Sequence, residues 1–224
     1  MNSQTQRSTI AGAAGAIEIA IDMPAPPPGG PAAPRGVAIV AHPHPLFSGT
    51  LDNKVAQTMA RAFVQAGWMA VRFNFRGVGA SAGVHDEGIG EAEDYLTVLR
   101  HAAPDAATPL ALAGFSFGAF VATHALARLQ QERAATANPI EKVVLVGLSV
   151  SRAPAAVIDA ALHDKTLVIH GEADDTVLLA DVMDWARPQA LPVLVVPGGG
   201  HFFHGQLPLL KSLVLRHLAG VPTI

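Results

Sequence analysis

One stretch of the chain decides its fold: Leu110-Ala-Leu-Ala-Gly-Phe-Ser-Phe-Gly-Ala119. A short apolar run, typical of a buried strand, ends there in the pattern G-x-S-x-G, and a helical pattern begins at once. This context predicts a nucleophile elbow, a sharp turn that holds the hydroxyl of Ser116 clear above a sheet. The turn requires a strained backbone at Ser116, and Gly114 and Gly118 let the strand and the helix approach each other.

The same five-residue pattern occurs a second time, at Gly79-Ala-Ser-Ala-Gly83. Arg76-Gly-Val78 before it already has the composition of a loop, and residues 84–87 after it have no helical apolar period. Because only Ser116 lies directly between a strand and a helix, we assign the nucleophile to Ser116 and interpret Ser81 as a loop residue.

Size and composition limit the class of protein. The chain has 224 residues, of which 50% are hydrophobic and 15% charged, and this is enough for one α/β domain with a large core. A net charge of -3 provides no basic surface for nucleic acid, and the lack of cysteine excludes disulfides and thiol catalysis. We find no signal peptide and no apolar run of membrane-spanning length, and we expect a cytoplasmic protein.

Short apolar runs alternate with helical patterns, which predicts a mostly parallel, twisted sheet of about seven or eight strands with helices on both faces. Strands are expected at residues 16–22, 36–41, 68–75, 110–115, 143–146, 167–169 and 193–196, and helices at 53–66, 89–99, 117–129, 153–162, 177–186 and 207–218. We expect a single domain over residues 1–224, in which residues 1–15 are a flexible or edge-strand segment. The connection between the strands at Val146 and Leu167 is too short for a cap domain.

Three loops that follow strands carry the residues of a catalytic triad. In open α/β sheets the site lies at the carboxyl ends of the strands. Asp174 lies in the loop after the strand at 167–169, and His201 follows a run of three glycines after the last strand. His201 is expected to take the proton of Ser116, and Asp174 to orient the imidazole, in the chain order Ser, Asp, His.

The tetrahedral intermediate of such a reaction also needs backbone donors for its oxyanion. One is expected to be the N–H of Phe117, and the other belongs to the loop that begins with His42-Pro-His-Pro45. Proline has no N–H, which leaves His44 or Leu46. We favour His44 because it is nearer to the end of the strand.

Three motifs beyond the triad carry a resemblance to a known family. They are His42-Pro-His-Pro-Leu-Phe-Ser-Gly49, Asp52-Asn-Lys-Val55 and Arg72-Phe-Asn-Phe-Arg-Gly-Val-Gly79. Together they resemble the small, lidless bacterial α/β-hydrolases related to dienelactone hydrolases, over residues 16–218. The resemblance implies an α/β-hydrolase fold without a cap domain, the triad Ser116, Asp174 and His201, and an oxyanion role for the His-Pro-His-Pro loop.

Two positions depart from that family. Ser48 stands where a glycine is usual before Gly49, and little consequence is expected because serine is small. Dienelactone hydrolases proper use a cysteine nucleophile. Ser116 occupies that place here, which argues against that activity.

Other residues compete for the triad roles. Glu172 and Asp175 lie close to Asp174 in the chain, but only Asp174 has the D-x-x-V spacing of the family. His204 is near His201, but we place it at the start of the last helix, where it would cap that helix. Asp174 and His201 therefore remain the assigned pair.

The remaining histidines have structural interpretations. His42, His44 and His201 together suggest a metal site, but no His-x-x-x-His or carboxylate spacing supports one. We expect His42 to bond the backbone and shape its loop, and His170 and His124 to be structural histidines of the core. No metal and no cofactor are expected.

These residues predict a serine hydrolase that cleaves a small carboxylic ester or thioester through an acyl-enzyme. Phe47, Phe202 and Phe203 are the candidate walls of a shallow substrate pocket, together with Phe117. An amide or C–C bond hydrolase with the same triad and a non-catalytic binding protein of this fold are the alternatives. The expected partner is a small-molecule substrate rather than nucleic acid or a membrane, and a homodimer is left open.

Overall fold

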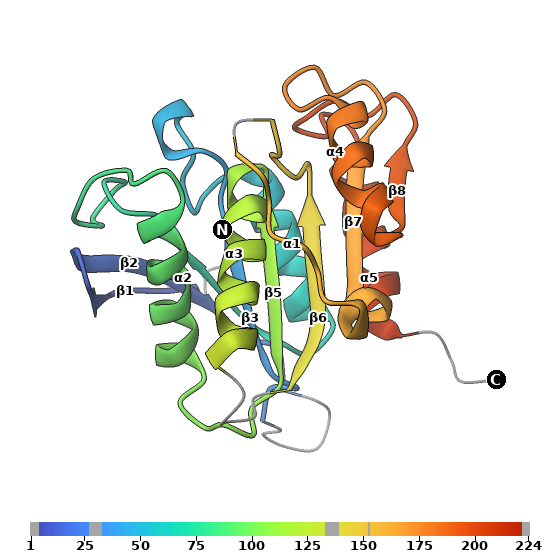
Figure 1. Ribbon diagram of the computed structural model, residues 1–224. Coiled ribbons are helices and arrows are strands. Elements are labelled where there is room, and N and C mark those ends of the chain that lie inside the picture. Colours follow the sequence, from blue (N-terminus) through green and yellow to red (C-terminus); the bar gives the residue numbers. More distant parts are fainter. Residues whose placement is uncertain (1–4, 27–32, 133–138, 152, 221–224) are drawn as a thin grey trace.

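An eight-stranded, mostly parallel sheet forms the centre of the molecule (Figure 1). The computed structural model describes residues 5–26, 33–132, 139–151 and 153–220. The strand order is β1-β2-β4-β3-β5-β6-β7-β8. The first hairpin, β1 with β2, is antiparallel, β2 is also antiparallel to β4, and the other neighbours are parallel. The predicted fold class is confirmed.

Most elements lie where the apolar patterns predict them. The strands are β1 (Gln6–Gly12), β2 (Gly15–Asp22), β3 (Val37–Ala41), β4 (Met69–Phe73), β5 (Leu110–Phe115), β6 (Ile140–Val146), β7 (Thr166–Gly171) and β8 (Val193–Val196). The α-helices are α1 (Lys54–Gln65), α2 (Ile89–Ala102), α3 (Phe117–Glu132), α4 (Leu179–Ala186) and α5 (Leu207–Ala219). The described ranges also contain the short 3-10 helices η1 (Pro45–Phe47), η2 (Ala160–Lys165) and η3 (Arg187–Gln189).

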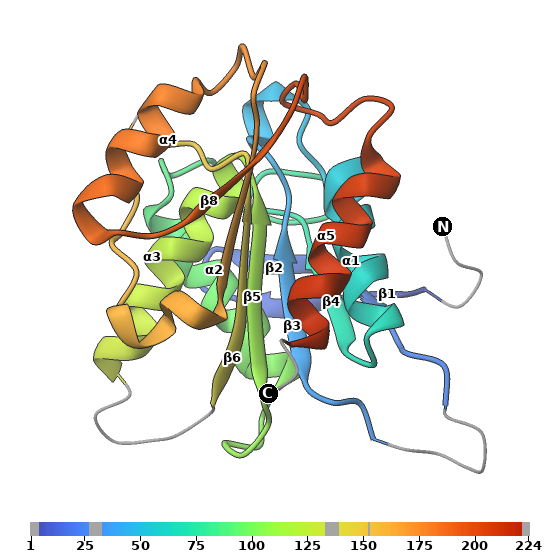
Figure 2. The same cartoon turned by 90° about the vertical axis from the view of Figure 1, so that its right-hand side faces the viewer.

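Helices cover both faces of the sheet, and Figure 2 shows the two layers on either side of it. α2, α3 and α4 pack into the hydrophobic cluster of one face, and α1 and α5 into the cluster of the other. β3 and β5 lie in the middle and every residue in them is buried. This burial on both faces explains why their sequences are continuous apolar runs rather than alternating ones.

The polar N-terminal segment contains the edge strand β1, one of the two forms expected for residues 1–15, and its side chains are mostly exposed because it lies at the edge of the sheet. One local difference from the sequence-based expectations has a clear cause. The helix expected at residues 153–162 is wrong: the chain is irregular from 153 to 159 and only η2 follows. The carboxylate of Asp159 accepts the N–H of Ala161 and so starts the helical turn later than the apolar pattern suggests.

The described helices include none that combines the length and the apolar character needed to cross a membrane.

Tyr95 ties α2 to the two central strands. Its hydroxyl is fully buried, donates to the carbonyl of Ile39 in β3 at 2.8 Å and accepts the N–H of Ala113 in β5 at 3.0 Å. Burial raises the pKa of this phenol, so it stays a neutral donor.

We expect Tyr95→Phe to lower the free energy of unfolding by about 1–3 kcal/mol, because the substitution leaves two buried backbone groups without this partner. Urea denaturation followed by circular dichroism measures the change. A variant as stable as the wild type would show that the two strands satisfy these groups without the hydroxyl.

Candidate active site

Ser116 lies at the turn between β5 and α3 with a φ of 57°, the left-handed conformation expected of a nucleophile elbow. A Cβ at Gly114 would collide with the carbonyl of Gly118, and a Cβ at Gly118 would collide with the carbonyl of His42. Both flanking positions therefore need glycine, because backbone approaches backbone on each side of the serine.

The structure brings Ser116, Asp174 and His201 together although they are far apart in the chain. The Nε2 atom of His201 lies 2.9 Å from the Ser116 hydroxyl, and its Nδ1 atom lies 2.7 Å from a carboxylate oxygen of Asp174. One neutral tautomer satisfies both contacts, with Nδ1–H donating to Asp174 and Nε2 accepting the serine proton. This is the proton path that a serine nucleophile requires.

Asp174 is held as a carboxylate. Burial alone would raise its pKa, but hydrogen bonds from His201 and from the N–H groups of Val177 and Thr176 outweigh burial and lower the pKa below its usual value. Its Oδ2 atom also lies 3.5 Å from Nε2 of His170, a ring that donates to the carbonyl of Val177. His170 is fully buried, as expected of a structural histidine.

The competing residues lie outside this chain of hydrogen bonds. Glu172 is exposed and accepts the N–H of Gly198, and Asp175 is exposed as well. His204 is exposed in the turn before α5 and does not cap that helix, whose N-cap is Gln206.

His42 shapes its loop through two buried hydrogen bonds. Its Nδ1 atom lies 2.6 Å from the carbonyl of Pro43, and its Nε2 atom accepts the N–H of Phe75 at 3.0 Å. Burial lowers the pKa of His42 to about 4, so the ring is neutral at pH 7. In the part of the chain that the structure describes, no group of three or more metal-ligating side chains is placed to hold an ion.

The loop after β3 forms η1, and His44 is its N-cap residue. The Nδ1 atom of His44 accepts the N–H of Leu46 at 3.3 Å, so Leu46 is already engaged as a donor. Ser48 ends η1 with a φ of 62°, a left-handed conformation that explains why a glycine suits this position.

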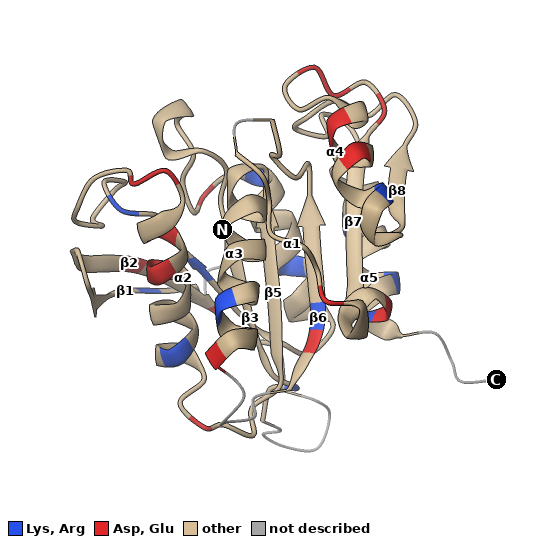
Figure 3. Ribbon diagram, in the orientation of Figure 1, with Lys and Arg blue, Asp and Glu red and all other residues tan. Residues whose placement is uncertain are grey.

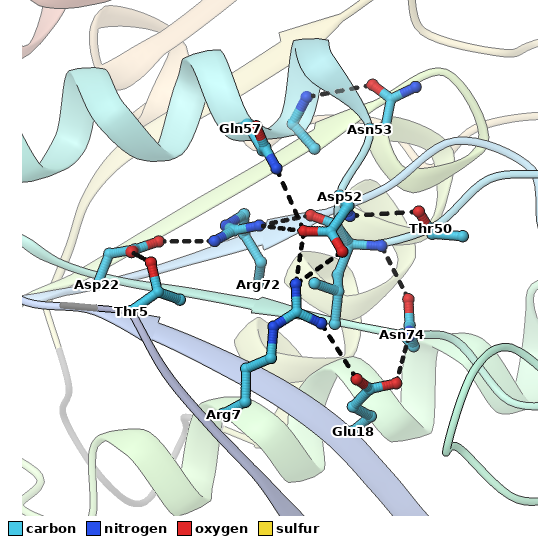
Figure 4. A network of polar contacts seen from close by, with 12 residues as sticks. Thr5, Arg7, Glu18, Asp22, Thr50, Asp52, Asn53, Gln57, Arg72 and Asn74 are labelled. Atoms are coloured by element: carbon cyan, nitrogen blue, oxygen red, sulfur yellow. Dashed lines mark hydrogen bonds and ion pairs between the residues drawn. The ribbon is translucent and has the colours of Figure 1, made fainter. Parts of the chain in front are cut away.

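A polar network anchors this loop to the sheet (Figure 4). The peptide groups of Leu51 are held on both sides, since Arg72 donates to the Leu51 carbonyl at 2.7 Å and the Asn74 side chain accepts the Leu51 N–H at 2.8 Å. Arg72 also pairs with Asp22 at 2.9 Å, and Asn74 donates to Glu18 at 2.7 Å. The network therefore links β2 and β4 to the chain that enters α1.

The edge strand joins the same network. Arg7 in β1 contacts both carboxylate oxygens of Asp52 at 2.7 Å, and Asp52 precedes Asn53, the residue whose side chain caps α1. The sequence analysis predicted no structural role for Arg72 or Asn74 and did not predict the ion pair. The apolar pattern identifies strands but does not show which strands are neighbours in the sheet.

Two neighbouring pockets share His44 and Phe47 as walls. The first, which we call the serine pocket, has a volume of about 280 Å³ and is lined by Ser116, His201 and Phe202 among others. The second, which we call the Phe117 pocket, has a volume of about 160 Å³ and lies on the side of Phe117.

Only some of the phenylalanines that were expected to line the substrate pocket do so. Phe47 and Phe202 are exposed and line the serine pocket. Phe203 does not line it, and its assignment as a pocket wall is wrong: its side chain is fully buried in the cluster between the sheet, α1 and α5. The turn gives Phe203 a φ of 51°, which directs consecutive phenylalanines to opposite sides of the loop.

His124, expected in the core, is half-buried and contacts the carbonyl of Pro154.

The rim next to Asp174 is acidic. Figure 3 shows Asp and Glu gathered in the loop after β7 and in α4. Glu172 and Asp175 in this loop are exposed. A negative rim disfavours the approach of anionic substrates.

The fold and the site together define the class of protein. A serine at a nucleophile elbow, hydrogen-bonded to a histidine and an aspartate at the carboxyl ends of a mostly parallel sheet, is the arrangement of the α/β serine hydrolases. The family model described as X-Pro dipeptidyl-peptidase (S15 family) matches residues 15–145, more than half of the chain, and the chain belongs to this family. The matched segment includes Ser116 and ends before Asp174 and His201.

Solved structures agree with this classification. An α/β serine hydrolase homologue of Coxiella burnetii is 34% identical, covers 95% of this chain and 97% of its own, and has a TM-score of 0.76. An α/β serine hydrolase without a lid, from Xanthomonas campestris, is 31% identical, covers 100% of this chain and 98% of its own, and has a TM-score of 0.79. The chain is a serine hydrolase of this fold.

A curated relative is similar over a shorter range. An uncharacterized protein of Rickettsia prowazekii is 43% identical over 95 residues, which are 41% of this chain and 40% of that protein. The chain therefore matches less than half the length of this relative.

The buried neutral state of His42 predicts a pH dependence of stability. Its folded pKa of about 4 lies below the ordinary 6.5, so the unfolded chain binds the extra proton between these values. The contribution of His42 is present above pH 6.5 and is lost as the pH falls toward 4, by up to about 3 kcal/mol.

We expect the stability advantage of the wild type over His42→Asn to shrink from pH 7 to pH 4.5, as measured by urea unfolding at each pH. Every other titrating group, including the half-buried His217, is present in both proteins and cancels in the difference. Two curves that run parallel over this range would contradict the assignment.

Proposed function

We propose that this chain is a carboxylesterase-like enzyme that cleaves small carboxylic esters or thioesters through an acyl-enzyme on Ser116. The observation that supports the proposal is the hydrogen-bonded chain from Ser116 through His201 to Asp174, with bond lengths of 2.9 and 2.7 Å, in a pocket open to solvent.

In the proposed reaction, the Ser116 hydroxyl attacks the ester carbonyl while Nε2 of His201 takes its proton. Asp174 stabilises the imidazolium that forms. The imidazolium then gives its proton to the leaving alcohol or thiol, and an acyl group remains on Ser116. Water repeats the sequence from the same side and releases the acid.

We assign the oxyanion hole to the N–H groups of Phe117 and His44. Phe117 is the first residue of α3, where backbone N–H groups have no partner within the helix. His44 is preferred to Leu46 because it lies nearer to the end of β3, where the oxyanion loop begins. Each N–H of such an oxyanion hole lowers the activation free energy by about 3–4 kcal/mol.

The openness of the site favours a small ester over a long buried chain. Residues 147–165 connect β6 to β7, and in their described part the only regular element is η2. The described chain therefore places no second layer over the serine pocket. The family name makes peptide hydrolysis next to proline the competing reaction, since the same triad can cleave an amide.

We expect a fluorophosphonate probe to label the wild type, and Ser116→Ala to abolish labelling and to lower kcat for p-nitrophenyl acetate by about 10⁴-fold or more, because the nucleophile is lost. Ser81→Ala is the matched control, since Ser81 lies in the second G-x-S-x-G pattern. Among the described residues its hydroxyl bonds the backbone of Glu18 and Asn74, away from the triad, so labelling should persist.

Labelling that survives Ser116→Ala would overturn the assignment of the nucleophile. A comparison of p-nitrophenyl acetate with alanyl-proline p-nitroanilide separates the two reactions. We expect a kcat/KM at least 100-fold higher for the ester, and the reverse order would favour the peptidase activity.

A further inference from the structure

We propose that the Phe117 pocket binds the acyl group of the substrate and that His85 selects an acyl group with a hydroxyl on an aromatic ring. The inference rests on the proposed esterase function and adds the substrate class. It follows from the position of the general acid, the size of the pocket and a second histidine–carboxylate pair.

The position of His201 distinguishes the two pockets. The leaving oxygen must lie next to Nε2 of His201, because this atom returns the proton. His201 lines the serine pocket and not the Phe117 pocket, so the leaving group occupies the serine pocket. The acyl substituent then points to the other side of the oxyanion hole, where Phe117 and His44 line the second pocket.

The Phe117 pocket has the size and lining for a single aromatic ring. Its volume of about 160 Å³ is close to that of a cavity that holds benzene, about 150 Å³. Phe47, Phe117 and Phe120 line it, and the rings of Phe117 and Phe120 are stacked at 5.9 Å. Aromatic walls favour flat apolar groups through offset or edge contacts.

His85 provides a polar group on the wall of this pocket. Its Nδ1 atom lies 2.8 Å from Glu91, a fully buried carboxylate at the start of α2. Glu91 also accepts the N–H groups of Asp86 and Gly88, at 2.9 and 2.8 Å. A carboxylate bound in this way acts only as an acceptor, so it fixes the proton of His85 on Nδ1.

In the neutral ring the remaining nitrogen, Nε2, is a hydrogen-bond acceptor. It forms no hydrogen bond with any residue of the described ranges, and the ring packs against His44 and Phe117 at 4.8 and 5.4 Å. An acceptor on an aromatic wall is complementary to a hydroxyl at the edge of a ring. The exposed Glu87 at the rim disfavours a carboxylate on the same ring.

The experiment keeps the leaving group constant and changes only the acyl group. The substrates are p-nitrophenyl acetate, benzoate, 3- and 4-hydroxybenzoate, and the matching methoxybenzoates. For the wild type we expect at least one hydroxybenzoate to exceed its methoxy analogue about tenfold in kcat/KM, the value of one hydrogen bond of about 1.4 kcal/mol. In His85→Phe this ratio should fall toward one.

A second variant tests the pocket without removing a partner of Glu91. Ala153 lines the Phe117 pocket, and Ala153→Leu should lower the ratio of benzoate to acetate kcat/KM about tenfold by filling it. Val157→Leu is the matched control, because Val157 is 69% exposed and lines neither pocket. The control should leave the ratio unchanged.

The outcomes separate this inference from the function on which it rests. One outcome would overturn the acyl pocket alone. In it, fluorophosphonate labelling and acetate hydrolysis are intact, His85→Phe leaves the ratio of hydroxybenzoate to methoxybenzoate kcat/KM unchanged, and Ala153→Leu leaves the ratio of benzoate to acetate kcat/KM unchanged. An Ala153→Leu variant that changes the preference among alkyl leaving groups of acetate esters instead would likewise overturn the acyl pocket. No labelling and no ester hydrolysis in the folded wild type would overturn both proposals.

Discussion

The site depends on a close contact between two segments of backbone. α3 begins directly against the end of β3, so that Gly118 faces the carbonyl groups of Ala41 and His42 with no room for a side chain. This contact fixes the left-handed conformation of Ser116 and, at the same time, the distance between the serine and the loop of His44. The nucleophile and the proposed oxyanion donors are thus positioned by the same steric constraint.

Buried polar groups extend this constraint to the neighbouring strand ends. The His42 ring bonds the backbone of Phe75 after β4, and Asn74 holds Leu51 on the way into α1. Ser81 closes the group by donating to the carbonyl of Asn74 at 2.7 Å. Loops at the end of a sheet are usually its most variable part, but here each is bonded to the next through groups shielded from water.

The fold class could be predicted from the sequence, and so could the proximity of Ser116, Asp174 and His201. Continuous apolar runs identify the buried strands, and parallel topology forces their carboxyl ends together, so residues in separate loops can be placed at one edge. The composition around Ser81 predicted a loop and not a nucleophile elbow. The structure agrees and places Ser81 in a buried turn.

The parts that sequence reasoning missed depend on side-chain direction and on non-local neighbours. A turn with one left-handed residue sends Phe203 into the core and leaves Phe202 outside, and two adjacent phenylalanines give no signal of this. The pair of His85 and Glu91 joins a Gly-rich loop to the first turn of a helix, where the local pattern shows only a solvated loop. Edge strand β1 was not missed, but it is polar and lacks the apolar run by which the other strands are recognised, so a flexible segment and an edge strand remained alternatives there.

The ion pair between Arg7 and Asp52 connects the outermost strand, β1, to the segment that enters α1. The next residue, Asn53, caps α1 and lines the serine pocket, so β1 is linked through Asp52 to one wall of that pocket. A substitution of Arg7 would therefore act on this wall of the pocket through Asp52 and leave the hydrogen bonds of the triad in place.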